Sequence, residues 1–156
     1  MSDGGTANGR LADFLPYQLS ITSNAASSLI AERYRARFGL KIAEWRVMAV
    51  LGDAGSATQR ALTEATLMDK VAVNRACKVL EERGLIARSP NAEDGRSHLL
   101  ELTEEGRAIH SEVMPLARDM EREIFSALNE DEREQLRDLL RRIFAQTEKL
   151  RPASRV

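Results

Sequence analysis

The sequence lacks the features that mark exported or membrane-spanning proteins. It has a single cysteine, Cys77, which excludes an internal disulfide framework. The longest unbroken apolar run is five residues, 47–51, whereas a membrane-spanning helix needs about 20. Residues 1–10 have no apolar stretch after a basic start, so we interpret them, like residues 151–156, as a flexible tail and not as a signal peptide. The expected location is the cytoplasm.

Signals of enzymatic chemistry are lacking as well. The sequence contains no Walker loop, no Rossmann glycine pattern and no G-x-S-x-G motif. Its two histidines, His98 and His110, have no metal-ligand spacing with Cys77. We therefore expect no catalytic residue, no metal and no cofactor, and a protein that is not an enzyme.

Apolar residues that recur every three or four positions predict six helices. The predicted helices cover 11–37, 42–51, 58–66, 69–83, 103–128 and 129–150. Asp13, Thr58 and Asp69 are the candidate N-caps of the first, third and fourth helices. Asn129 and Glu132 have the spacing of a capping box, which places the start of the last helix.

Two short apolar segments between these helices have the pattern of β-strands. They are Leu85–Arg88 and Ser97–Leu102, and the polar residues 89–96 between them predict a hairpin. Two short helices joined by a tight turn indicate a helix-turn-helix. The fold class is therefore mainly α, with one small hairpin (α+β). The terminal helices carry more apolar surface than a small central lobe can cover, which indicates a partner subunit.

The helix 69–83 has two contrasting faces. Its apolar face is formed by Val73, Ala76, Cys77 and Leu80. Its polar face carries Lys70, Ala72, Asn74, Arg75 and Lys78. Asparagine can bond adenine through two atoms, arginine can bond guanine, lysine can bond phosphate, and Val71 or Ala72 can meet a thymine methyl group. The alternative interpretation is an ordinary solvated helix face.

The predicted hairpin tip favours the nucleic-acid interpretation. Asp94 and Arg96 flank Gly95, and Arg88 lies on the strand that leads to the tip. An arginine at such a tip can enter a minor groove or contact phosphates, and a nearby aspartate can hold its guanidinium group. Residues 58–98 carry seven basic and six acidic residues, whereas residues 103–151 carry nine and twelve. This asymmetry has the sign expected of a DNA-binding lobe.

Three blocks of sequence, in this order and spacing, connect the chain to a known family. They are Leu80-Glu81-Glu82-Arg83-Gly84-Leu85-Ile86-Ala87-Arg88, Asn91-Ala92-Glu93-Asp94-Gly95-Arg96 and Leu102-Thr103-Glu104-Glu105-Gly106. Over residues 11–150 the sequence resembles the MarR family of bacterial winged-helix transcriptional regulators. The D-x-R of the second block corresponds to the family's wing.

The resemblance implies a single domain over residues 11–150, built as a winged helix-turn-helix with long dimerisation helices. Residues 41–102 would form the DNA-binding lobe, and 11–38 and 103–150 would form the dimer interface. The implied protein is a homodimer that binds a pseudo-palindromic duplex, with helix 69–83 in the major groove. It would be a repressor that a small aromatic or phenolic ligand releases from its operator.

The candidate site residues follow from the polar helix face, the hairpin and the resemblance. The DNA-binding candidates are Thr58, Gln59, Lys70, Val71, Ala72, Asn74, Arg75, Lys78, Arg88, Asp94 and Arg96. The ligand-binding candidates are Trp45, Met48 and His110.

Several alternatives stay open at this point. Trp45 fits a core anchor better than a ligand contact, and His110 fits a solvated or interface position better than a ligand contact. Cys77 fits a buried apolar residue better than a redox sensor. A formal charge of −1 leaves room for a winged-helix module that contacts protein, and an enzyme on this scaffold would need a cleft with perturbed titrating groups.

Overall fold

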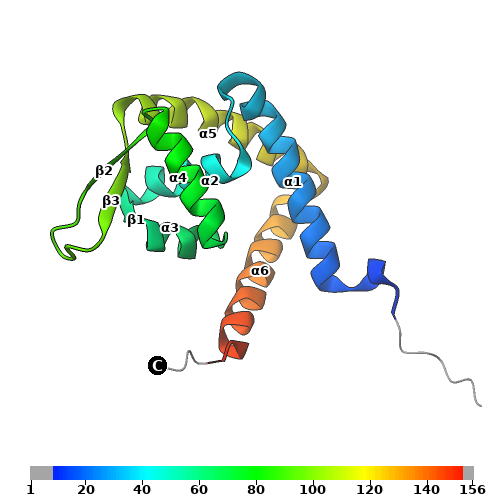
Figure 1. Ribbon diagram of the computed structural model, residues 1–156. Coiled ribbons are helices and arrows are strands. Elements are labelled where there is room, and N and C mark those ends of the chain that lie inside the picture. The colour runs from blue at the N-terminus through cyan, green and yellow to red at the C-terminus, as the bar shows by residue number, and fades with distance from the viewer. Residues whose placement is uncertain (1–8, 153–156) are drawn as a thin grey trace, which may run out of the picture. The chain divides into compact units, whose positions relative to one another are not determined.

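The computed structural model describes residues 9–152 and divides the chain into two compact units, residues 1–120 and 121–156 (Figure 1). We call them the N-terminal and the C-terminal unit. The predicted tails fall largely on residues 1–8 and 153–156, which lie outside the described residues. Within the described part, no helix is long and apolar enough to cross a membrane.

All six predicted helices are present. Their bounds are α1 Leu15–Phe38, α2 Ile42–Ala54, α3 Gln59–Thr66, α4 Lys70–Glu82, α5 Glu104–Ile124 and α6 Glu130–Leu150. The predicted cap of the first helix is wrong, because Asp13 ends a short 3-10 turn and Phe14 is the N-cap of α1. Pro16 lies in the first turn of α1, where its missing N–H costs no hydrogen bond.

The N-caps of the two short helices are confirmed. Thr58 Oγ1 accepts a hydrogen bond from the N–H of Ala61 at 3.1 Å, and Asp69 Oδ1 accepts one from Ala72 at 2.8 Å. Each cap satisfies a backbone donor that the first helical turn leaves unpaired. The positions at which α3 and α4 begin are therefore fixed by local sequence.

The hairpin is confirmed as part of a three-stranded antiparallel sheet with the order β1-β3-β2 (Figure 1). Strands β2 (Ile86–Pro90) and β3 (His98–Leu102) pair from Ile86 opposite Leu102 to Pro90 opposite His98. Strand β1 (Ser56–Thr58) was not predicted, because three residues are too few to show an alternating pattern. It pairs with β3 and so joins the start of α3 to the hairpin.

The glycines of the family motif have a direct structural role. Gly84, with φ +70°, follows α4 and turns the chain into β2. Gly106 lies in the first turns of α5, where a Cβ would approach the carbonyl oxygen of Leu85 to 2.0 Å. Between them, Thr103 Oγ1 donates to the carbonyl oxygen of Gly84 at 2.6 Å. The hairpin is therefore clamped to the ends of α4 and α5.

The core of the N-terminal unit is continuous beneath α2, α3, α4 and the sheet. Its fully buried large side chains are Leu40, Val47, Met48, Leu51, Leu62, Val73, Cys77, Leu80, Leu85, Leu100 and Val113. The predicted apolar face of α4 is confirmed, since all four of its residues are buried. The opposite face of α4 is thereby directed outward.

The C-terminal unit contains the last residues of α5, a 3-10 turn (Phe125–Ala127) and α6. The predicted capping box is confirmed. Asn129 Oδ1 accepts from the N–H of Glu132 at 2.8 Å, and Glu132 Oε1 accepts from the N–H of Asn129 at 3.0 Å. No residue of α6 is buried, so its apolar stripe is uncovered in the single chain.

Candidate nucleic-acid interface

The outward face of α4 is a row of exposed donors with one exposed apolar residue. Lys70, Asn74, Arg75 and Lys78 are exposed, and Ala72 is half-buried. Val71 is 62% exposed although it is apolar. Because the buried face of α4 is packed into the core, the helix cannot rotate to withdraw these side chains.

The hairpin tip is shaped by its own hydrogen bonds. Asp94 Oδ1 accepts from the backbone N–H of Arg96 at 3.0 Å, and Asn91 Nδ2 donates to Ser97 Oγ at 3.0 Å. The sequence predicted that Asp94 would hold the guanidinium group of Arg96. The bond instead goes to the backbone, as in an Asx turn, so Asp94 fixes the loop and leaves the Arg96 side chain exposed.

Arg88 is bonded to α4 of its own chain. Its Nε and Nη2 donate to the two carboxylate oxygens of Glu81 at 2.8 and 3.2 Å. The hydrogen bond from Arg88 lowers the pKa of Glu81, and the same bond raises the pKa of Arg88. The pair joins the last turns of α4 to β2, so Arg88 helps to fix the hairpin beside α4 in addition to any contact outside the protein.

Two adjoining pockets bring most of the predicted DNA-binding residues together. The first, of about 350 Å³, lies between the start of α3 and the hairpin and is lined by Thr58, Gln59, Arg60, Arg88, Asn91, Asp94, Arg96, Ser97 and His98. The second, of about 470 Å³, lies between α3 and α4 and is lined by Gln59, Arg60, Thr63, Glu64, Lys70 and Asn74. Gln59 and Arg60 line both pockets.

The sequence did not identify Arg60, Asn91, Ser97 and His98 as site residues. Arg60 could have been found from the sequence, because it is a basic residue in the first turn of α3, next to the candidate Gln59. Its side chain is 90% exposed and lies 3.4 Å from Glu64, its helical neighbour. His98 and Ser97 are brought to the site only by the register of the hairpin.

A third pocket, of about 570 Å³, lies between α2 and α5 and has polar and apolar walls. It is lined by Ala49, Gly52, Asp53, His110, Ser111, Met114, Pro115 and Arg118. Of the three ligand-binding candidates, only His110 lines it. Burial lowers the pKa of His110, which favours the neutral imidazole.

The other two ligand candidates lie beneath this pocket. The Trp45 ring is 5.5 Å from the His110 ring and 5.9 Å from the Tyr34 ring, and Trp45 is only 8% exposed. Met48 is fully buried in the core. In this structure the buried Trp45 ring therefore packs against the His110 ring. A direct ligand contact by Trp45 or Met48 stays a prediction.

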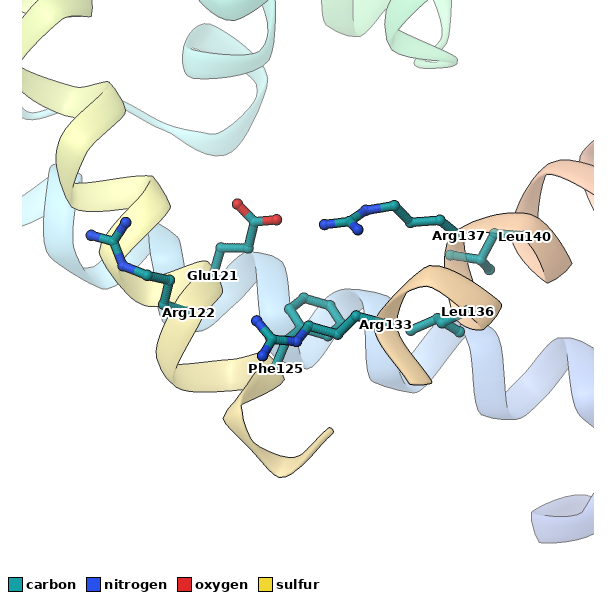
Figure 2. Close-up of a pocket in the computed structure, with 7 residues that line it drawn as sticks. All are labelled: Glu121, Arg122, Phe125, Arg133, Leu136, Arg137 and Leu140. Atoms are coloured by element: carbon teal, nitrogen blue, oxygen red, sulfur yellow. The ribbon is translucent and has the colours of Figure 1, made fainter. Parts of the chain in front are cut away.

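The C-terminal unit has a pocket of its own, of about 340 Å³ (Figure 2). Figure 2 shows Glu121 of α5 and Phe125 of the 3-10 turn on the side of α6, whereas Arg122 points to the other side of α5. The α6 side chains are Arg133, Leu136, Arg137 and Leu140. Arg133 Nε is buried and has no hydrogen-bond partner among the described residues. The pocket is thus partly apolar, and one of its lining donors, Arg133 Nε, has no hydrogen-bond acceptor among the described residues.

Groups that would hold a metal or react as a nucleophile are not gathered in the described part of the chain. Residues 9–152 contain no cluster of three or more His, Cys, Asp or Glu side chains able to bind a metal ion. Burial raises the pKa of the Cys77 thiol to about 11, and the nearby Glu81 adds to the effect. At neutral pH Cys77 is a protonated thiol within the core.

A capped pair of short helices followed by a clamped hairpin defines a winged helix-turn-helix protein. The model of the MarR family matches residues 38–97 of this chain. The HTH-type transcriptional regulator YdgJ of Bacillus subtilis is 30% identical over 128 residues, which cover 81% of this chain and 75% of YdgJ. The chain belongs to the MarR family of transcriptional regulators.

Another relative matches a shorter stretch. The HTH-type transcriptional repressor NicR of Pseudomonas putida is 32% identical over 96 residues, 62% of this chain. The match spans about three fifths of the repressor's own length, 61%.

Solved structures of similar proteins cover most of the chain. A probable transcriptional regulator of Pseudomonas aeruginosa has a TM-score of 0.74 and 33% identity, covering 86% of this chain and 99% of that one. A MarR variant of Escherichia coli in complex with operator DNA has a TM-score of 0.75 and 25% identity, with 86% and 98% covered. BpsR of Bordetella bronchiseptica, whose DNA binding is regulated by 6-hydroxynicotinic acid, has a TM-score of 0.78 and 26% identity, with 86% and 96% covered.

Proposed function

We propose that this chain is a sequence-specific DNA-binding regulator in which α4 enters the major groove and the β2–β3 hairpin contacts the adjoining backbone or minor groove. The observation that carries the proposal is the continuous surface formed by the exposed face of α4, the start of α3 and the hairpin tip. The E. coli relative bound to operator DNA supports the same use of the fold.

The residues on this surface divide into two roles. Lys70, Lys78 and Arg96 are exposed cations without base-reading geometry of their own, and they suit phosphates or a narrow minor groove. Asn74, Arg75 and Val71 are exposed in the first two turns of α4 and suit base edges. Phosphate contacts would fix the position of the helix, and base contacts would select the sequence.

The regulator acts as a homodimer. Apolar side chains of α1 and α6 are exposed in the single chain, including Leu15, Leu19, Leu29, Leu139, Leu140, Ile143 and Phe144. Exposed apolar faces of this extent mark interaction surfaces, and a two-fold dimer pairs each face with its own copy. An acidic group of the second copy would also satisfy Arg133 Nε. Two recognition helices then read two half-sites about one helical turn apart.

DNA binding is released by a small aromatic acid that occupies the pocket between α2 and α5. Arg118 offers donors for a carboxylate, and His110 offers a ring face. NicR is a repressor, and the DNA binding of BpsR responds to 6-hydroxynicotinic acid, which supports a ligand of this class. A coupling free energy of about 1–3 kcal/mol between the two sites is enough for a regulatory response. In this proposal the DNA-bound chain represses transcription, and the ligand relieves that repression.

The DNA-binding proposal is tested with single substitutions in the full-length protein. Arg96→Ala and Arg75→Ala are expected to weaken binding to a duplex from upstream of the chain's own gene by about tenfold, as for the loss of a charged contact of about 1–3 kcal/mol. Arg142→Ala is the matched control, because Arg142 is an exposed arginine of α6 that pairs with Asp138 at 3.7 Å. Equal effects of all three substitutions would contradict the proposed surface.

The ligand proposal is tested on the same complex. Titration with 6-hydroxynicotinic acid is expected to release the duplex, and Arg118→Gln is expected to raise the concentration required while leaving DNA affinity unchanged. A second candidate function, a winged-helix module that contacts protein, is favoured by the formal charge of −1. A stable dimer that binds no duplex but holds a protein partner would establish that alternative.

A further inference from the structure

The proposed DNA-binding surface is formed by α4, the start of α3 and the hairpin tip. Within it, a side-chain hydrogen bond joins α3 to α4. Gln59, the first residue of α3, donates from Nε2 to Oδ1 of Asn74, in the second turn of α4, and the contact is short. We propose that Gln59 is a positioning residue that orients the Asn74 carboxamide to read an adenine in each half-site. The inference rests on the proposed DNA-binding function.

The backbone at both ends of this bond is held firmly. Thr58 belongs to β1 and caps α3, so the strand and the helix cap both fix the residue before Gln59. The carbonyl oxygen of Gln59 also accepts a hydrogen bond from Thr63 Oγ1 at 2.9 Å. Asn74 lies on α4, whose opposite face is packed into the core. The two carboxamides are therefore presented at a set separation before any DNA arrives.

The surroundings favour one orientation of the Gln59 carboxamide. Of the charged groups that line the pocket on the hairpin side of Gln59, Arg60, Arg88 and Arg96 are donors only, and the Asp94 carboxylate already accepts from the backbone N–H of Arg96. The carbonyl oxygen of Gln59 is favoured on that side, so its NH₂ group is left for Asn74. If the Asn74 carboxamide were rotated by 180°, its NH₂ group would face the NH₂ group of Gln59, and two donors cannot bond each other.

The bond leaves Asn74 with the pattern that adenine requires. A carboxamide oxygen has two lone pairs, and its nitrogen has two hydrogens. Gln59 occupies one lone pair, so Oδ1 can still accept from N6 of adenine while Nδ2 donates to N7. Val71 lies one turn earlier on the same exposed face and can meet the methyl group of a neighbouring thymine.

The test uses a pool of double-stranded oligonucleotides with randomised sequence, from which the full-length protein selects its half-sites. Adenine is expected at one half-site position with a preference of about tenfold over the other bases. Asn74→Ala is expected to abolish the preference at that position only. Gln59→Glu is expected to reduce it strongly, because a carboxylate cannot donate to Oδ1 and favours the rotated Asn74.

The variants include their own controls. An acidic residue in the first turn of a helix is favourable, so Gln59→Glu is expected to fold normally. Glu64→Gln changes a neighbour that lines the same pocket and is bonded to Arg60, not to Gln59 or Asn74, and it is expected to retain the adenine preference. The effects of Gln59→Glu and Asn74→Ala are expected to be non-additive, since one side chain acts through the other.

The outcomes separate this inference from the proposed function. If Gln59→Glu keeps the adenine preference, or loses affinity equally for every sequence, Gln59 does not orient Asn74 and the inference is wrong. If the unaltered protein selects no sequence from the pool, the DNA-binding function itself fails.

Discussion

Replacing Gly52 by alanine tests the packing that supports His110 beside the pocket. A Cβ atom at position 52 would lie 2.2 Å from Nε2, 2.6 Å from Cδ2 and 2.7 Å from Cε1 of His110. All three distances are shorter than any ordinary contact, so the ring must move. Its movement changes the contact with the Trp45 ring, whose centroid lies 5.5 Å away.

The expected cost follows from two opposing effects. Overpacking of this kind costs about 1–3 kcal/mol, whereas alanine in a helix interior is favoured over glycine by about 0.5–1 kcal/mol. Gly52 lies inside α2, so both effects apply. Gly52→Ala is expected to lower the free energy of unfolding by as much as about 2.5 kcal/mol. In a protein that also carries His110→Ala the clash is absent. There, Gly52→Ala is expected to raise the free energy of unfolding by about 0.5–1 kcal/mol.

Urea unfolding of the four proteins at one protein concentration, followed by circular dichroism, measures both effects. The fixed concentration matters because the stability of a dimer depends on it. A change of sign between the two backgrounds is the specific result expected. The packing argument is refuted if Gly52→Ala stabilises the protein with His110 present, or destabilises it equally in both backgrounds.

Three further predictions concern titrating groups. Burial lowers the pKa of His110 from 6.5, so below that pH the folded state binds fewer protons than the unfolded state. The free energy of unfolding should therefore fall as the pH drops below about 6.5. In unfolding curves measured over a pH series, His110→Gln should reduce this fall. The hydrogen bond from Arg88 lowers the pKa of Glu81 from 4.5, so the pair should stabilise the fold above that pH and lose its effect as the pH falls. Arg88→Ala should remove this contribution to the loss of stability in acid. Cys77 should react with an aromatic disulfide reagent at pH 8 only as fast as the protein unfolds, and reaction within seconds would contradict its burial.

Features set by local sequence were predicted correctly. Thr58, Asp69 and Asn129 are caps because a short polar side chain just before an apolar periodic segment can bond the free N–H groups of the first turn. The two faces of α4 were correct for a similar reason, since the spacing of its apolar residues fixes which side is buried. Asp13 failed because Pro16 sets the start of α1 nearer to Phe14.

Features that depend on tertiary pairing were missed. Strand β1 exists only because β3 lies beside it, and the bond from Gln59 to Asn74 joins residues fifteen positions apart on different helices. Trp45 and Met48 were expected as ligand contacts, but both are buried and neither lines the pocket between α2 and α5, which the sequence could not show. The role of Asp94 depended on whether its carboxylate bonds a side chain or the backbone, which only the folded turn decides.

The most direct test of the account is the affinity of the full-length protein for a labelled duplex from upstream of its own gene, compared with a scrambled duplex across a salt series by fluorescence anisotropy. The account predicts tighter binding to the genuine sequence, with log affinity falling by about 0.9 per phosphate contact for each unit of log salt concentration. Arg96→Ala should reduce that slope by about 1 if Arg96 contacts phosphate. Equally weak binding to both duplexes at every salt concentration would contradict the claim that α4 and the hairpin form a sequence-specific DNA-binding surface for this operator.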